Sequence, residues 1–278
     1  MKLKMKMGIA IAATAILTSQ TVVQAVEAEK PAAEVEKPTA ELDLGVFSQY
    51  VWRGEALSKN SAVFEPSATI GYKGVSLNIW GNFDTDSKPW NGAKYNETDI
   101  TLSYTKAIGI TKLTGGYIYY ALNEQPAVAA TATTAAIPAS KDTQEVFGSV
   151  GLDVFLSPTI TVYRDIASFP GWYVNVGISH SIPVVDKITL DLAGSAGYYY
   201  SDSSSLVEAK SPNSKYRALH NGLISAGFTI PFGDYFSVKP MLAYSFPLSS
   251  KAQDFIEANS VGGGSSFVYG GATFVMTF

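Results

Sequence analysis

Charged side chains recur on the polar face of the alternating segments of this chain, and they offer most of its possible chemistry. Eight of them share that face: Asp43, Arg53, Glu65, Asp99, Glu145, Asp153, Asp191 and Lys239. If this face surrounds water, the charges would set a transverse field, and the acidic excess of six to two would weakly favour cations. The alternative is that the charges pair with one another and fill a narrow interior. The residues that we select as lumen or selectivity candidates are Arg53, Glu65, Asp99, Glu145, Asp191 and Lys239.

Arg53 is the candidate with the most specific chemistry. It is expected to end the first strand, near the outer mouth of the interior. A guanidinium there would orient an anionic solute or shape a constriction, because its planar fork of donors matches carboxylates. The alternative is a structural pair with Glu55, with Glu65 or with a loop backbone.

Catalytic and metal chemistry find little support in the sequence. There is no cysteine, and His180 and His220 are the only histidines. The alternation places both histidines outward near opposite ends of the fold, and no serine beside them lies in a nucleophile motif, so a Ser-His hydrolase site is not expected. The sequence contains no paired metal ligands, phosphate-binding loop or dinucleotide fingerprint. We therefore predict no enzyme and no cofactor.

The elements that must position these groups are predicted to be β-strands. Apolar and polar residues alternate with a period of two, as in Leu42, Leu44 and Val46 opposite Asp43 and Gly45. The segments with this pattern are residues 42–53, 64–72, 75–83, 99–104, 145–154, 159–163, 174–179, 188–198, 224–230, 236–245 and 267–278. Residues 110–122 are rich in β-forming residues, but their facing is ambiguous. Together these segments predict about twelve antiparallel strands.

We favour a single closed transmembrane barrel over a soluble β-sandwich for these strands. Their apolar faces carry almost no charge, as expected for contact with lipid. Short and long connections also alternate along the chain, and a sandwich has no reason to sort its loops in this way. The connection near residues 167–171 is the exception, because it is short where a long one is expected. Aromatic residues are expected at the membrane interfaces: Tyr50, Trp52, Tyr117 to Tyr120, Trp172, Tyr173 and Tyr198 to Tyr200.

The last strand has the pattern of an outer-membrane assembly signal. Phe274, Met276 and Phe278 fall on one face, and the final residue is aromatic. Such a strand can face lipid and pair with the first strand. We expect the barrel-assembly machinery to bind this segment during insertion.

The N-terminal region predicts export. A basic head and a short apolar run precede a small-residue cleavage site, so residues 1–25 are a predicted signal peptide, with Ala28 as a rival cleavage site. Residues 26–40 are rich in Glu, Ala, Lys and Pro and predict a disordered leader. The barrel is then expected over residues 41–278. The formal charge of −4 argues against nucleic acid as a partner.

The first strands resemble a known family. Residues 45–54, which end in Tyr50-Val51-Trp52-Arg53-Gly54, and the stretch Trp80-Gly81-Asn82-Phe83-Asp84 are similar to the opening of the TorF-like (Gcw_chp) family of outer-membrane porins. The resemblance is good over residues 45–84 and fair to about residue 120. It departs at Glu55 to Lys59, and residues 123–142 look like an insertion. It implies a porin-type barrel with no catalytic residues.

The interpretation that joins these features is a barrel in the outer membrane of a Gram-negative-type bacterium, with both termini periplasmic. We expect a passive diffusion channel for small polar solutes or ions with a weak cation bias, surrounded by outer-membrane lipids. A homo-oligomer is expected by analogy only. The alternative is a non-conducting barrel whose loops bind a partner or support the envelope.

Overall fold

The computed structural model describes residues 37–59, 61–86, 94–123 and 141–278. The predicted signal peptide and most of the predicted leader lie outside these residues. The described chain enters its first strand at Thr39, two positions before the predicted start of the barrel.

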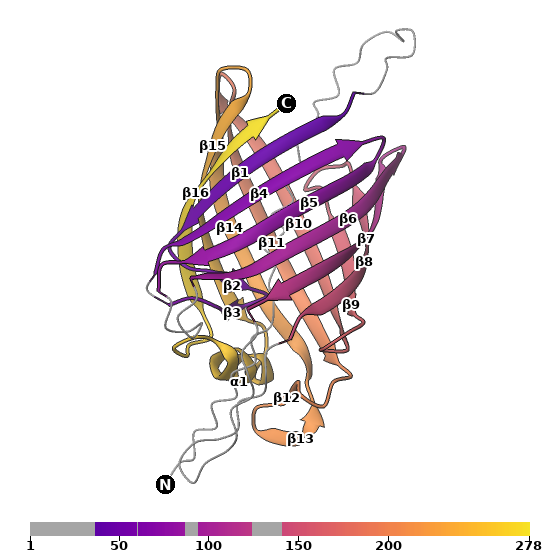
Figure 1. Ribbon diagram of the computed structural model, residues 1–278, viewed down its shortest axis with the longest axis vertical. Coiled ribbons are helices and arrows are strands. Elements are labelled where there is room, and N and C mark those ends of the chain that lie inside the picture. Colours follow the sequence, from indigo (N-terminus) through magenta and orange to yellow (C-terminus); the bar gives the residue numbers. More distant parts are fainter. Residues whose placement is uncertain (1–36, 60, 87–93, 124–140) are drawn as a thin grey trace.

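Twelve antiparallel strands form one closed barrel, which confirms the predicted fold (Figure 1). Around the barrel, each strand pairs with its neighbours in sequence, and the first pairs with the last. The strands are β1 (Thr39–Phe47), β4 (Val63–Tyr72), β5 (Val75–Asp84), β6 (Tyr95–Ile108), β7 (Thr111–Leu122), β8 (Thr143–Leu152), β9 (Thr159–Asp165), β10 (Gly171–Val185), β11 (Ile188–Ser201), β14 (Arg217–Phe232), β15 (Phe236–Pro247) and β16 (Phe267–Thr277). Closure leaves no unpaired strand edge, which is the condition for crossing a bilayer with strands.

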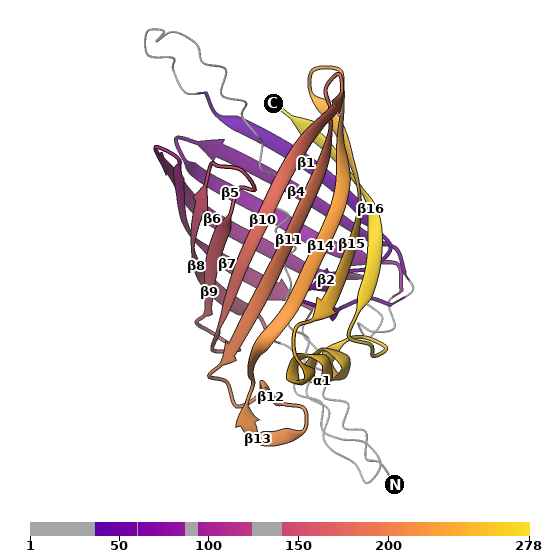
Figure 2. The same cartoon turned by 180° about the vertical axis from the view of Figure 1, so that it is seen from behind.

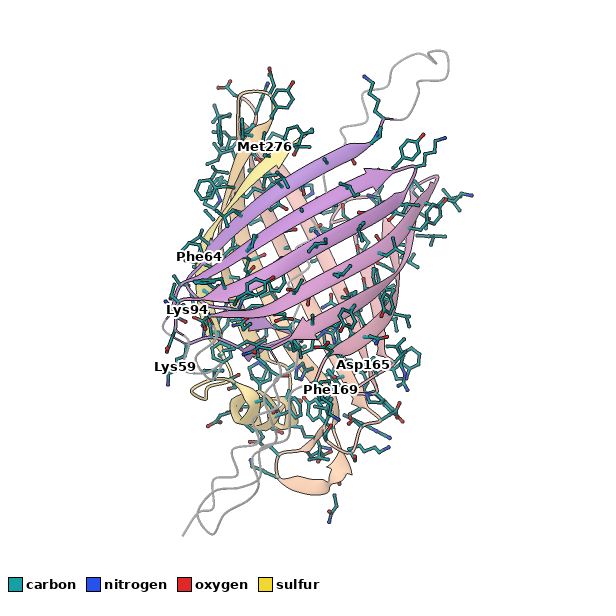
Figure 3. All side chains as sticks on the ribbon, viewed as in Figure 1. Lys59, Phe64, Lys94, Asp165, Phe169 and Met276 are labelled. Carbon is teal, nitrogen blue, oxygen red and sulfur yellow. The ribbon has the colours of Figure 1, made fainter. Side chains whose placement is uncertain are left out.

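The outer face of the barrel is apolar and exposed. Leu44 and Phe274 face each other across the closing pair and are 43% and 50% exposed. Phe64 and Met276 lie on the same outer surface, at the barrel wall (Figure 3). In a β-sandwich, these apolar rows would pack against each other in the core. In this barrel they form the outer surface, which suits contact with acyl chains.

The two ends of the barrel differ, as the alternation of loop lengths predicts. At one end, the short-turn end, strands are joined through residues 73–74, 109–110, 153–158, 186–187 and 233–235. The C-terminus lies at this end (Figure 1). At the other, the loop end, the connections are residues 48–62, 85–94, 123–142, 166–170, 202–216 and 248–266. The short loop after β9 is at the loop end, as predicted.

In the described parts of these long connections, three contain secondary structure. The first holds the hairpin of β2 (Val51–Trp52) and β3 (Glu55–Ala56), and the fifth holds β12 (Val207–Glu208) and β13 (Ser211–Lys215). The sixth holds the helix α1 (Ser250–Asn259), which begins at the N-cap Ser249. Figure 2 shows α1 and the β12–β13 hairpin at the same end of the barrel.

The first strand is shorter than predicted. It ends at Phe47, and Tyr50 and Trp52 belong to the inner hairpin, where they are 1% and 3% exposed. The prediction that they form an interface girdle is wrong, because the chain turns inward after Phe47. The prediction also fails for Tyr120, Tyr173 and Tyr199, which face inward and are buried, whereas Trp172 and Tyr198 face outward.

The register of the strands settles the ambiguous facing of residues 110–122 and corrects the predicted facing of His220. In β7, Ile118 and Tyr120 point inward, because Ile118 pairs with the inward Glu145. In β14, a bulge places two residues, His220 and Asn221, opposite Gly197. A bulge adds one residue and so reverses the facing of what lies beyond it. His220 is therefore inside and fully buried, and its predicted outward facing is wrong, whereas His180 packs against Phe155 on the outer face.

Candidate functional site

The interior of the barrel has two parts with different properties. Toward the short-turn end, inward side chains are small, polar and only partly buried, among them Ser67, Asn78, Ser103 and Ser149. We call this polar inner surface the vestibule. Toward the loop end, inward side chains are buried beneath the β2–β3 hairpin and α1, and we call residues 48–59 together with α1 the plug.

The plug is held together by apolar and backbone contacts between the first and last loops. Tyr50, Trp52 and Leu57 share one buried cluster with Phe255 and Ile256 of α1. The backbone N–H of Ala56 donates to Ser260 Oγ at 3.0 Å, and the N–H of Val261 donates to the Ala56 carbonyl at 2.7 Å. Ser249 caps α1 by accepting from the Ala252 N–H at 3.2 Å. Two loops far apart in sequence therefore form one body.

A two-residue turn places Arg53 inside the barrel. Arg53 and Gly54 join β2 to β3, and both have positive φ angles, 42° and 90°. Such φ values at both central residues are typical of a type I′ hairpin turn, which matches the twist of paired strands. The Trp-Arg-Gly stretch thus forms a turn within the lumen rather than the end of a barrel strand, which corrects the predicted place of Arg53.

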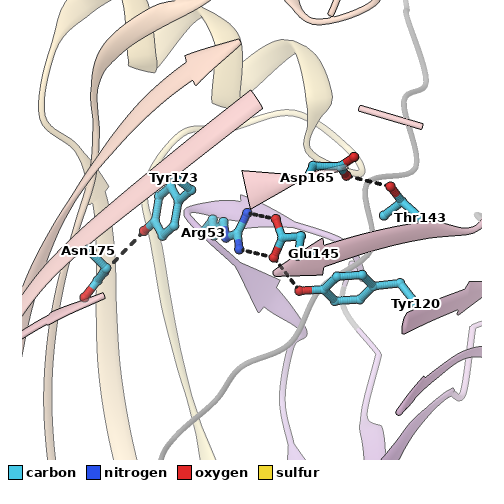
Figure 4. A network of polar contacts seen from close by, with 7 residues as sticks. All are labelled: Arg53, Tyr120, Thr143, Glu145, Asp165, Tyr173 and Asn175. Carbon is cyan, nitrogen blue, oxygen red and sulfur yellow. Dashed lines mark hydrogen bonds and ion pairs between the residues drawn. The ribbon is translucent and has the colours of Figure 1, made fainter. Parts of the chain in front are cut away.

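Arg53 forms a two-pronged ion pair with Glu145, another sequence candidate. Its two terminal nitrogens donate to the two carboxylate oxygens at 2.8 and 2.7 Å (Figure 4). The Tyr120 hydroxyl donates to the same carboxylate at 2.7 Å. The side chains of Arg53 and Glu145 are only 8% and 5% exposed. Arg53 therefore forms a structural ion pair, as the alternative interpretation of the sequence expects. Its partner is Glu145 instead of Glu55, Glu65 or a loop backbone.

Aromatic rings surround the same guanidinium. Its central carbon lies 4.4 Å from the ring centre of Trp52, 4.8 Å from that of Tyr163 and 4.3 Å from that of Tyr173. Such distances are within the range of cation–π attraction. We call Arg53, Glu145 and these three rings the Arg53 cage.

Two further sequence candidates, Glu65 and Asp99, are buried in the wall beside the plug. Glu65 is 8% exposed and accepts a hydrogen bond from the Trp80 side chain. Asp99 is fully buried. Tyr50 of the plug donates to Glu97 at 3.0 Å in the same region. The first loop therefore lies against an acidic stretch of wall formed by β4 and β6.

Asp191 and Lys239 lie apart from this group, in the vestibule. Asp191 accepts hydrogen bonds from Ser181 at 2.5 Å, from Thr189 at 3.2 Å and from Thr229 at 2.7 Å. Lys239 is on the inner face of β15 and partly exposed. Four of the six candidates are therefore buried near the plug, and the other two, Asp191 and Lys239, are partly exposed in the vestibule.

The sequence analysis missed a buried pair beneath the plug. His220 Nε2 lies 4.0 Å from Glu55 Oε1, and Tyr216 Oη lies 2.7 Å from His220 Nδ1. Within the described residues, neither Glu55 oxygen nor His220 Nε2 has a hydrogen-bond partner. Burial raises the pKa of Glu55 to about 8, although the charge of Arg53 lowers it in part. Only the β14 bulge, which alternation does not reveal, brings His220 to this position.

The assembly-signal residues face outward. Phe274 and Phe278 are 50% and 56% exposed, and Met276 lies between them on the same face. Over the described ranges, no group of three or more metal-ligating side chains comes together. None of the helices in the described part of the chain is long and apolar enough to cross a membrane.

Comparison with known proteins identifies no family for this chain. No family model matches the chain, and no curated protein matches it. Among similar solved structures, the COG4313 outer membrane channel from Pseudomonas putida F1 is 8% identical, with 90% of this chain and 100% of that chain covered and a TM-score of 0.41. OmpT, an outer membrane protein of Vibrio cholerae, is 11% identical, with 87% and 97% covered and a TM-score of 0.41. The beta domain of the Bordetella autotransporter BrkA is 9% identical, with 87% and 99% covered and a TM-score of 0.40. The assignment of the chain as a closed antiparallel barrel rests on its own strand pairing.

Proposed function

We propose that this protein is an outer-membrane channel through which small polar solutes or ions diffuse passively. The observation that carries the proposal is the vestibule, whose inward Ser, Thr, Asn and Asp side chains are partly exposed while the opposite face of the same strands is apolar. A barrel that served only as an anchor would not need a water-lined interior. Membership of the TorF-like family, which the first hairpin suggests, is part of this proposal.

The plug sets the constriction in this proposal. Buried side chains fill the loop half, so a solute entering from the vestibule would meet the Arg53 cage and the acidic wall of Glu65 and Asp99. In their ionised form, the carboxylates of Glu65 and Asp99 would favour cations, because a negative charge beside the path attracts a passing cation. We propose that both termini lie in the periplasm, since the N-terminal end of β1 and the C-terminus lie at the short-turn end.

A second candidate function is a non-conducting barrel whose loops bind a partner. The observation in its favour is the plug itself, which packs a hairpin and a helix into a shared buried cluster. A plug of this kind would block permeation if it never moved. The loops on the same end would then present the functional surface.

Conductance measurements in planar bilayers separate the two candidates. We expect the purified protein to give discrete current steps, and a variant with residues 51–56 replaced by a Gly-Ser linker to give larger ones. A salt gradient should give a reversal potential of cation sign. No steps from either protein over a wide voltage range would support the non-conducting barrel, and an anion-selective current would contradict the proposed bias.

A further inference from the structure

The wall of the barrel supplies most of the Arg53 cage. Glu145, Tyr163 and Tyr173 come from β8, β9 and β10, three strands that are neighbours in the barrel. Tyr163 and Tyr173 are direct cross-strand partners, and their ring centres lie 6.1 Å apart. Tyr120 on β7 fixes the carboxylate by a hydrogen bond. These groups sit on paired strands, so they would keep their places if the hairpin moved.

Only Trp52 and the cation itself come from the hairpin. Arg53 reaches the wall from a turn whose positive φ is uncommon for a residue with a side chain. Its partner Glu145 is 92 positions away in the sequence. The barrel wall thus supplies a binding site for a cation, and a separate loop supplies Arg53, the cation that fills it.

The chemistry of this binding site selects planar organic cations. Two carboxylate oxygens match the paired donors of a guanidinium, and ring faces attract its delocalised charge. A strongly hydrated ion such as sodium gains less here, because it has no planar fork and holds its water more tightly. A buried carboxylate without any cation is strongly unfavourable, so an emptied cage would take up either a proton or a second cation in place of Arg53.

The cage also borders the vestibule. Asn175, a partly buried inward residue of β10, donates to the Tyr173 hydroxyl at 3.3 Å (Figure 4). Tyr163 and Phe147 beside it are likewise only partly buried. A small cation in the vestibule would therefore meet the rings of the cage before the interior of the plug.

We infer that Arg53 is a tethered occupant of a cation-binding site, and that the same site takes guanidinium-bearing solutes from the vestibule when Arg53 withdraws. Binding of such a solute would compete with the hairpin for Glu145 and favour the withdrawn position. This names small organic cations as the solutes that the channel selects. The transport part of the inference rests on the proposed function, whereas the binding site does not.

Chemical rescue of Arg53→Ala tests the site. The probe is methylguanidinium at millimolar concentration, with urea as a neutral planar control and sodium as a simple cation. In detergent micelles, Arg53→Ala should have a lower Tm than the natural protein, and methylguanidinium alone should raise it again. The double variant Arg53→Ala/Glu145→Gln should show no such rise, because the carboxylate that holds the cation is gone.

The result that would overturn the binding site is a Tm of Arg53→Ala that methylguanidinium leaves unchanged, or that it raises equally in the double variant. Should Arg53→Ala fail to refold alone, the refolding yield with each probe replaces Tm as the measured quantity. The same criterion then applies, since only methylguanidinium should raise the yield and only when Glu145 is present.

Bilayer currents test the transport part separately. Methylguanidinium should block or carry current through the Arg53→Ala channel at concentrations at which sodium and urea have no effect. A rescued Tm together with silent bilayers from every variant would retain the binding site and reject the channel. Currents from Arg53→Ala that respond alike to all three probes would reject the cage as a selectivity site.

Discussion

Gly54 lies directly against Asn221, so that a Cβ atom on Gly54 would be 2.7 Å from the Cβ of Asn221 and 3.1 Å from Ile256 Cδ1. The inner hairpin is thus seated between the β14 bulge and α1 with no space for one more carbon. Gly54 also has a positive φ of 90°, which only glycine adopts freely. This close approach explains why the turn of the hairpin ends in glycine.

Gly54→Ala should therefore loosen the plug. The left-handed backbone alone costs a residue with a side chain about 1–2 kcal/mol, and overpacking adds about 1–3 kcal/mol. The matched control is Gly109→Ala, which has a positive φ of 59° but no atom within 4 Å of the new Cβ. Urea unfolding should show a larger loss for Gly54→Ala than for the control, and proteolysis should cut residues 48–59 faster. Equal losses would mean that the hairpin does not pack against Asn221.

Removing either partner of the Arg53–Glu145 pair should lower the free energy of unfolding strongly. Removing both should lower it by much less than the sum of the two single losses. Arg53→Met leaves a buried carboxylate and Glu145→Gln leaves a buried guanidinium, and each such change typically costs about 3–5 kcal/mol. A double-mutant cycle by urea unfolding checks this, because the double variant should lose much less than the sum of the single losses. Additive losses would show that the two side chains do not interact in the folded protein.

The contribution of Glu55 to the stability of the plug should decrease as pH rises. The pKa of the Glu55 carboxyl is about 8 in the folded protein and is ordinarily 4.5, so the folded state holds this proton more tightly. Its contribution is complete below pH 4.5, declines above that value and is lost as pH rises through about 8. The measurement is the rate of protease cleavage in residues 48–59 from roughly pH 4 to pH 9, which brackets the transition. Glu55→Gln should flatten the profile, and an unchanged slope in that variant would assign the effect to another group.

Two adjacent residues of β8 test which face meets lipid. Val150 points outward and is 41% exposed, whereas Ser149 points inward and its hydroxyl lies 2.9 Å from that of Thr161. Val150→Arg should destabilise the folded barrel in lipid by about 2–4 kcal/mol, the cost of a lipid-facing Arg near the midplane. Ser149→Arg should cost less in the same unfolding assay and should reduce cation selectivity in bilayers. The opposite ranking in unfolding would reverse the assignment of the two faces.

We expect the aromatic C-terminus to matter for insertion more than for final stability. Phe278 is 56% exposed on the outer face, so Phe278→Ala removes few internal contacts. The amount of folded protein reaching the outer membrane of cells should fall, while the urea midpoint of protein refolded in detergent should hardly change. A normal amount in the membrane would remove the proposed role of Phe274, Met276 and Phe278 as an assembly signal.

The barrel could be predicted from sequence because lipid imposes a local rule. Each wall segment must alternate, so residues such as Leu42 to Val46 report their facing without knowledge of their partners. The number of strands and the sorting of the loops followed from that rule, and the structure confirms both.

The plug could not be predicted in the same way, because it depends on contacts between distant residues. Tyr50 and Trp52 continue the alternation of β1, so the inward turn after Phe47 was hidden. The Arg53-Gly54 dipeptide is compatible with a type I′ turn, but two residues alone do not predict one. Ala252, Phe255 and Ile256 have the spacing of one helix face, and the sequence analysis assigned them to a loop. Nothing local pairs Arg53 with Glu145, and the β14 bulge reverses the facing of His220.

The hydrogen bonds from the first loop to Ser260 and Val261 have a consequence for the order of folding. Ala56 reaches its final partners only when the last loop, which joins β15 to β16, lies against the first. Bringing such distant segments together carries a loop-closure entropy that nearby contacts do not share. The hairpin therefore stays unanchored on that side until the segment around Ser260 reaches it, and we expect the plug to be among the last parts of the protein to form.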